Sequence, residues 1–216
     1  MNKENYWVIG DVHGYYYALL ALIAKLPVGA ILVFVGDVID NWSQGAQVVK
    51  YVRENKCLSV MGNHEWMVME YAEAAIESIL RNEGIPFTIW TKDGGYGTLQ
   101  SYGLIERSSY LNPPMSTVKY QEGIDQMRDD IQWMKQLPLY IELPVQKQGR
   151  PVVISHHNIS WVWHERYHQD PSTQEKFENE VLWGRNQEAC EVAGIFNIFG
   201  HTPLGSEITK SQYSVH

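Results

Sequence analysis

The sequence predicts an α/β fold whose first third contains a largely parallel sheet. Amphipathic segments with helical spacing alternate with short apolar runs rich in β-branched residues. This alternation occurs three times, which favours parallel strands joined by right-handed crossovers. A length of 216 residues fits one compact domain over 1–216, with at most a cap. The expected strands are 6–9, 30–35 and 58–61, and the expected helices are 15–26, 44–55 and 66–81.

After the third helix the pattern changes, and a small helical cap is expected to be inserted at approximately 83–137. Glycine and proline residues divide this stretch into short pieces. A helix is expected from about 117 to 136, ended by Pro138. Apolar runs at 139–143 and 152–155 flank a polar turn and predict a hairpin, and 195–199 predicts a further strand.

Composition and charge exclude several classes of protein. With 44% hydrophobic and 19% charged residues, the chain is neither disordered nor a coiled coil. The 17 Lys and Arg residues against 25 Asp and Glu give a net charge of −8, which disfavours nucleic-acid binding. The longest apolar stretch, 28–35, is much shorter than the roughly 20 residues that cross a bilayer. Without a signal-peptide pattern, the cytoplasm is the expected location, where Cys57 and Cys190 would stay reduced.

Five of the predicted strands are followed by a residue type that binds metals. Because the carboxyl ends of parallel strands meet at one edge of a sheet, the first three of these loops are expected to lie together. Each loop taken alone has an ordinary structural explanation, such as a turn or a helix cap, but five in register favour a metal site. The five loops are Gly10-Asp11-Val12-His13-Gly14, Gly36-Asp37-Val38-Ile39-Asp40, Gly62-Asn63-His64-Glu65, Ser155-His156-His157-Asn158 and Gly200-His201-Thr202-Pro203.

The donor types indicate which metals would bind. Carboxylate, imidazole and amide oxygen suit manganese, iron or zinc, and no cysteine takes part. A bridging carboxylate can hold two ions about 3.5 to 4 Å apart, and such a pair can bind a hydroxide and a phosphate together. Asp37, on the middle strand, is best placed to bridge. Glycine beside each ligand leaves room where backbone and ion crowd together.

Together, these motifs resemble the calcineurin-like metallophosphoesterases. The closest resemblance is to the phosphoprotein phosphatase branch, which includes bacterial and phage serine/threonine phosphatases and symmetrical diadenosine tetraphosphate hydrolases. The resemblance implies a four-layer αββα sandwich, with the hairpin and the last strand in the second sheet. It also implies two divalent ions, manganese above all, with iron, zinc or nickel as alternatives. One ion would be held by Asp11, His13 and Asp37, and the other by Asp37, Asn63, His156 and His201.

The same resemblance implies catalytic roles. His64 would be the general acid that protonates the leaving oxygen, with Asp40 orienting it and favouring its charged form. A purely structural role for His64, as a helix cap, is the alternative. Arg185, in Leu182-Trp183-Gly184-Arg185, would grip phosphate oxygens; the alternative is a solvent-exposed arginine after a turn.

The chain also departs from the family pattern. Asn41 and Trp42 follow Asp40 where protein phosphatases carry Arg-Gly, and Met61 stands where they carry arginine. Only residues 204–216 follow the last motif, so a trimmed second sheet, or one completed by another chain in a homodimer, is expected. Three tryptophans are candidates either for stacking on a substrate or for the core or its rim: Trp42, Trp161 and Trp163.

The expected function is hydrolysis of phosphomonoesters, on a phosphorylated protein or a small phosphoester. A metal-bridging hydroxide would attack phosphorus in line, without a covalent intermediate. One alternative is a dinucleoside polyphosphate hydrolase acting on diadenosine tetraphosphate, and another is a non-catalytic scaffold on the same fold. Outside the motifs, Asp129 and Asp130 are expected to face solvent, and a histidine-bearing surface loop is expected to carry His157, His164 and His168.

Overall fold

The computed structural model describes residues 5–106, 117–186, 188, 190–203 and 214–215. The first sheet is parallel, with strands in the order β1-β2-β3. Its strands are β1 (Tyr6–Ile9), β2 (Ile31–Phe34) and β3 (Leu58–Ser59). The predicted parallel sheet is thus confirmed, although β3 is shorter than predicted. The chain leaves the sheet early because the backbone amide of Met61 donates to the carbonyl of Pro138, 2.9 Å away.

The second sheet is mixed, with strands in the order β4-β5-β6-β7. The predicted hairpin is formed by β4 (Tyr140–Lys147) and β5 (Arg150–Ser155), which pair antiparallel. Gln148 and Gly149 make its turn with φ angles of 53° and 77°. The remaining strands, β6 (Phe196–Ile198) and β7 (Ser214–Val215), run parallel to their neighbours.

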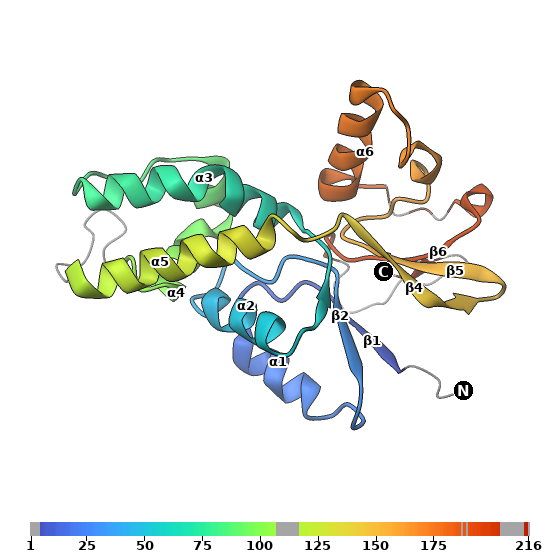
Figure 1. The fold of residues 1–216 in the computed structure, drawn as a ribbon, viewed down its shortest axis with the longest axis horizontal. Coiled ribbons are helices and arrows are strands. Elements are labelled where there is room, and N and C mark those ends of the chain that lie inside the picture. Colours follow the sequence, from blue (N-terminus) through green and yellow to red (C-terminus); the bar gives the residue numbers. More distant parts are fainter. Residues whose placement is uncertain (1–4, 107–116, 187, 189, 204–213, 216) are drawn as a thin grey trace.

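The elements form four layers, with helices outside two sheets, as Figure 1 shows. An apolar cluster lies between each pair of neighbouring layers. Successive side chains of a strand point to opposite faces, so neighbouring residues enter different clusters. Phe34 on β2 packs against the helices, whereas Val33 packs between the two sheets. In the same way, Ile154 on β5 faces the first sheet and Val153 faces α6. The predicted αββα sandwich is therefore confirmed.

The helices of the first half cover the outer face of the first sheet. They are α1 (Tyr16–Ile23), α2 (Gly45–Glu54) and α3 (Asn63–Leu80). The first two confirm the predicted segments, but α3 begins at Asn63 rather than at 66. It begins earlier because the Glu65 carboxylate accepts the backbone amide of Gly62 at 2.9 Å, which caps the first turn.

The segment at 83–137 contributes a short turn (Thr91–Gly95), α4 (Tyr96–Ser101) and α5 (Thr117–Met134). Its apolar side chains join the same cluster as α2 and α3. Asp129 is exposed as expected, but Asp130 is buried, so that expectation was wrong. The Asp130 carboxylate pairs with the Arg53 guanidinium and accepts a hydrogen bond of 2.8 Å from the Tyr102 hydroxyl.

Helix α6 (Pro171–Trp183) covers the outer face of the second sheet and was not predicted. Local signals for it exist in the sequence. The Asp170 carboxylate caps it by accepting the Thr173 amide at 3.0 Å, and proline occupies its first position. Within the described ranges, no helix has both the length and the apolar character to span a membrane.

Candidate metal centre

The five loops singled out in the sequence meet at one edge of the two sheets. Backbone amides of Val12 and His13 donate to the carbonyl of Asp37, at 2.9 and 2.8 Å. The backbone amide of Gly200 donates to the carbonyl of His156 at 3.0 Å. The backbone amide of His201 reaches the Asp11 carboxylate at 3.0 Å. Residues separated by up to 190 positions are therefore joined directly.

Two glycines make this close approach sterically feasible. A Cβ atom on Gly62 would lie 2.2 Å from Oδ1 of Asp37, and one on Gly200 would lie 2.4 Å from Oδ1 of Asp11. Neither distance is compatible with a side chain. The expectation that glycine leaves room beside the ligands is therefore met at these two positions but not at Gly10, where a Cβ would have no neighbour within 4 Å.

Four residues of the site have left-handed backbone conformations. Such conformations cost roughly 1 to 3 kcal/mol each in a residue other than glycine and cluster at functional sites. The φ angles are 48° at His13, 49° at Asp37, 68° at Asp40 and 73° at His201. The surrounding hydrogen bonds thus maintain a strained backbone that aims these side chains at one another.

The first group of candidate ligands is Asp37, His156 and His201, with Asn63 beside them. Nδ1 of His156 lies 2.8 Å from the carbonyl of Val35 and donates to it, so Nε2 presents a lone pair. That Nε2 lies 2.8 Å from Oδ1 of Asn63, 2.9 Å from Nδ1 of His201 and 3.4 Å from Oδ2 of Asp37. Nε2 of His156 and Oδ1 of Asn63 thus present lone pairs to each other beside a carboxylate, an arrangement that a cation between them would satisfy. These are the four residues that the resemblance assigns to one ion.

The second group is His13, Asp37 and His64. Nδ1 of His13 donates to the carbonyl of Ile39 at 3.1 Å, and its Nε2 faces Asp37 at 3.8 Å. Nε2 of His64 lies 3.9 Å from the same Asp37 oxygen. Asp11, which the resemblance assigns to this ion, is in neither group; its carboxylate accepts the backbone amide of His201 at 3.0 Å. Among the described residues, Asp37 alone belongs to both groups.

The protonation states of the site suit a divalent cation. Burial lowers the pKa of His156 to about 4. Burial, together with the neighbouring His156 and Arg185, lowers the pKa of His201 to about 3. Both imidazoles are therefore neutral and can act as ligands. Burial also raises the pKa of Asp37 well above its usual range, so its ionised form needs a nearby positive charge. A divalent ion would supply that charge.

His64 and Asp40 form a buried pair beside the ligands. Nδ1 of His64 lies 2.7 Å from Oδ2 of Asp40, whose residue is 0% exposed. Burial alone would lower the pKa of His64. The hydrogen bond to Asp40 and the charges of Asp37 and Asp40 outweigh it and raise that pKa to about 9. A charged imidazole here can donate a proton near neutral pH.

Arg185 is exposed and follows the end of α6. Its charge contributes to the lowered pKa of His201, which places the guanidinium within electrostatic reach of the ligands. Gly184 lets this segment approach, because a Cβ there would lie 2.1 Å from Nδ1 of His157. His157 is fully buried, so the expectation of a surface position was wrong, whereas His164 and His168 are exposed as expected.

Glu65 supports the site, and the sequence reasoning did not assign it a role. Its buried carboxylate accepts the backbone amides of Asp37, Val38 and Gly62, at 2.8, 2.9 and 2.9 Å. It therefore ties the loop after β2 to the loop after β3. A glutamate at the third position of a helix, following Gly62-Asn63, is the sequence signal that could have identified it.

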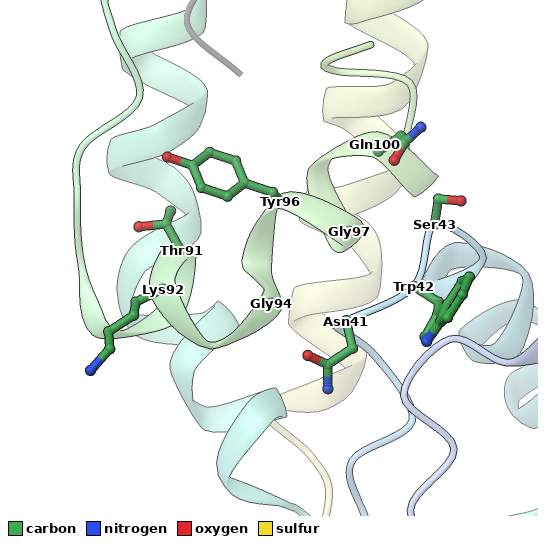
Figure 2. A pocket seen from close by; sticks show the side chains of 9 residues that line it. All are labelled: Asn41, Trp42, Ser43, Thr91, Lys92, Gly94, Tyr96, Gly97 and Gln100. Atoms are coloured by element: carbon green, nitrogen blue, oxygen red, sulfur yellow. The ribbon is translucent and has the colours of Figure 1, made fainter. Parts of the chain in front are cut away.

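A cavity of about 380 Å³ opens beside the loop that follows Asp40, as shown in Figure 2. Asn41, Trp42 and Ser43 line one side of it, and the other side is lined by Thr91, Lys92, Gly94, Tyr96, Gly97 and Gln100. Trp42 is half-exposed and packs against Tyr15 at a ring distance of 4.7 Å. Trp161 is also half-exposed, whereas Trp163 is buried in the core behind the second sheet and cannot stack on a substrate.

Comparison with known proteins adds to this geometry. The sequence profile of the calcineurin-like phosphoesterases matches residues 5–213. The chain is 32% identical over 97 residues to serine/threonine-protein phosphatase 1 of Salmonella typhimurium, covering 44% of this chain and 40% of that protein. It is 36% identical over 74 residues to an asymmetrical bis(5'-nucleosyl)-tetraphosphatase of Anoxybacillus flavithermus, covering 27% of this chain and 30% of that protein. The matched regions therefore span less than half the length of these relatives.

Among solved structures, a serine/threonine phosphatase from Saccharomyces cerevisiae aligns with a TM-score of 0.43 and 16% sequence identity. That alignment covers 98% of this chain and 53% of the other. A metallophosphoesterase from Sphaerobacter thermophilus aligns with a TM-score of 0.39 and 17% identity, covering 74% of this chain and 49% of the other.

Proposed function

Because this chain belongs to the calcineurin-like phosphoesterases, we propose that it is a dinuclear metal-dependent phosphatase that hydrolyses phosphomonoesters. The observation that supports this most is that Asp37 is common to two groups of candidate ligands, beside the His64–Asp40 pair. One ion would be held by Asp37, Asn63, His156 and His201, and the other by Asp37 and His13 with Asp11. When bound, such a pair of ions supplies Lewis acidity toward the phosphate and lowers the pKa of water.

The chain's own residues then handle the proton. The Nδ1–H group of His64 donates a hydrogen bond to the Asp40 carboxylate and keeps its proton. The proton on Nε2 is therefore the one available for transfer to the substrate. As water oxygen bonds to phosphorus and the bond from phosphorus to the leaving oxygen breaks, Nε2 of His64 protonates that oxygen. One proton of the water stays on the phosphate product, and the other replaces the proton that His64 gave up. Asp40 fixes the ring and stabilises its charged form before the transfer. The products are an alcohol and inorganic phosphate.

Substrate binding in this proposal involves Arg185. Its guanidinium can grip two phosphate oxygens in a planar fork. Its exposed position lets it meet an incoming phosphate before the buried ligands do. The named relative from Salmonella typhimurium supports a phosphoserine or phosphothreonine substrate, and a small phosphorylated molecule would use the same chemistry.

A second candidate function is hydrolysis of a dinucleoside polyphosphate. The half-exposed Trp42, packed on Tyr15 at the edge of the cavity, offers an aromatic surface for a nucleobase. Met61 stands where protein phosphatases carry an arginine, and the relative from Anoxybacillus flavithermus carries a tetraphosphatase name.

One substrate panel separates these functions. The purified protein is incubated with a nitrophenyl monoester, the matching diester, a phosphoserine peptide and diadenosine tetraphosphate, with manganese, iron, nickel and zinc in turn. The proposal expects the highest kcat/KM on the monoester or the phosphopeptide. A preference for diadenosine tetraphosphate would support the second candidate. Bound metal without turnover of any of the four would contradict both and support a non-catalytic scaffold.

A further inference from the structure

The Asp40 carboxylate receives hydrogen bonds from two residues of the inserted segment as well as from His64. The indole Nε1–H of Trp90 donates to both carboxylate oxygens, at 3.0 and 3.1 Å. The hydroxyl of Thr98 donates to Oδ1 at 2.5 Å. His64 uses the other oxygen, Oδ2, at 2.7 Å. Both carboxylate oxygens of Asp40 are therefore bound, and only Oδ2 is bound by His64.

Thr98 also fixes the backbone of Asp40. The Asp40 amide donates to the Thr98 hydroxyl at 3.0 Å, so one hydroxyl binds both the main chain and the side chain of the same residue. Asp40 has a φ of 68°, a conformation that such contacts help to hold. Asp40, Trp90 and Thr98 are all 0% exposed, so water does not compete for these bonds.

Backbone contacts dock the inserted segment against this loop. The amide of Asn41 donates to the carbonyl of Gly94 at 3.1 Å. A Cβ on Gly94 would lie 2.5 Å from the amide nitrogen of Asn41, and one on Gly97 would lie 2.8 Å from its carbonyl carbon. Figure 2 shows these glycines opposite Asn41 and Trp42. The inserted segment thus reaches Asp40 through a close backbone interface.

We propose that Trp90 and Thr98 are positioning residues for the general acid, holding Asp40 so that Oδ2 faces Nδ1 of His64. This inference rests on the proposed function. With His64 as its sole partner, the Asp40 carboxylate could rotate about its Cβ–Cγ bond, and the imidazole would lose its fixed direction. Catalytic groups must be held to within about 0.5 Å and 10 to 20° of the productive geometry, which requires neighbours that lock them.

The test compares two phosphate esters that differ in their need for an acid. Phenyl phosphate has a basic leaving oxygen that must be protonated, whereas dinitrophenyl phosphate releases a weakly basic oxygen without help. The variants are Trp90→Phe, which removes the indole donor, and Thr98→Val, which removes the hydroxyl at almost the same volume. Thr98→Ser restores the hydroxyl, and Trp163→Phe is the matched control, since Trp163 is a buried tryptophan of the core behind the second sheet.

We expect each of the two variants to lower kcat on phenyl phosphate by about 10-fold, part of the 10²- to 10⁴-fold that a general acid contributes. Their kcat on dinitrophenyl phosphate should change by less than about 2-fold, and metal content should stay that of the parent. Thr98→Ser and Trp163→Phe should behave like the parent.

Equal losses on the two esters, no loss on either, or loss of metal from a variant would overturn the inference. Loss of folding, read from the circular dichroism of each variant, would also count against it, because the residue would then act on the whole fold. A parent protein that cleaves neither ester would instead refute the proposed function, so the two failures are distinguishable.

Discussion

Substitution of Asp37 by asparagine tests the metal centre most directly, because Asp37 belongs to both groups of candidate ligands. His13 and His201 belong to one group each. An ion at 100 times its dissociation constant stabilises the folded state by about 2.7 kcal/mol, so two ions contribute about 5.4 kcal/mol. In a chain of 216 residues, each kcal/mol shifts Tm by roughly 2 to 4 °C. Saturating manganese should therefore raise the Tm of the parent by about 10 to 20 °C.

The assay is thermal unfolding with and without manganese, combined with metal analysis after desalting. Asp37→Asn should abolish the manganese-dependent rise in Tm, whereas His13→Ala and His201→Ala should each retain about half of it. Metal content should fall from two ions per chain to none in the first variant and to one in the others. A full Tm rise with two ions in Asp37→Asn would refute the assignment of Asp37 as the shared ligand.

Three further predictions concern the acid, a glycine and a buried tyrosine. His64→Gln should keep the metal content of the parent and lose roughly 10²- to 10⁴-fold in kcat on phenyl phosphate. If it instead lost one ion, His64 would be a ligand. Gly62→Ala should destabilise the fold by about 1 to 3 kcal/mol in urea unfolding, because its Cβ would lie 2.2 Å from a carboxylate oxygen. Gly84→Ala, with open space around it, is the control and should change stability by less than about 0.5 kcal/mol. Tyr102→Phe should cost about 1.5 to 3 kcal/mol, since its hydroxyl donates to a buried carboxylate 2.8 Å away. Tyr120→Phe should cost almost nothing, because its buried hydroxyl has no partner among the described residues, and equal losses in the two variants would contradict this account.

Much of the fold and the location of the site could be predicted because the relevant signals are local. Each metal-binding residue type follows an apolar run directly, so the strand end and the candidate ligand are adjacent in sequence. Parallel pairing of β1, β2 and β3 then brings three of the loops to one edge. The full composition of the second group could not be predicted in this way: the resemblance placed Asp11 with His13 and Asp37, whereas the structure brings His64 into that group. It depends on side-chain directions set by left-handed backbone at His13 and Asp37.

The supporting residues could not be predicted because their partners lie far along the chain. Trp90 contacts Asp40 across 50 positions, and Thr98 does so across 58. Neither has a sequence pattern that distinguishes it from an ordinary core residue. Asp130 was misplaced for the same reason. It was expected to face solvent on the predicted helix, but Arg53, 77 positions away, makes burial of the carboxylate tolerable.

Local sequence patterns were enough to predict the alternation of strands and helices and the residues that follow those strands, and hence the class of chemistry at one edge of the sheet. Only the packed structure showed that Trp90 and Thr98 bind the Asp40 carboxylate and that His64 lies in the group of His13 and Asp37. The two kinds of information differ in how far apart along the chain the residues lie. The apolar pattern of a helix or strand involves only residues that are close in sequence. A buried hydrogen bond needs two groups aligned to within a fraction of an ångström, and only the packed chain sets that alignment.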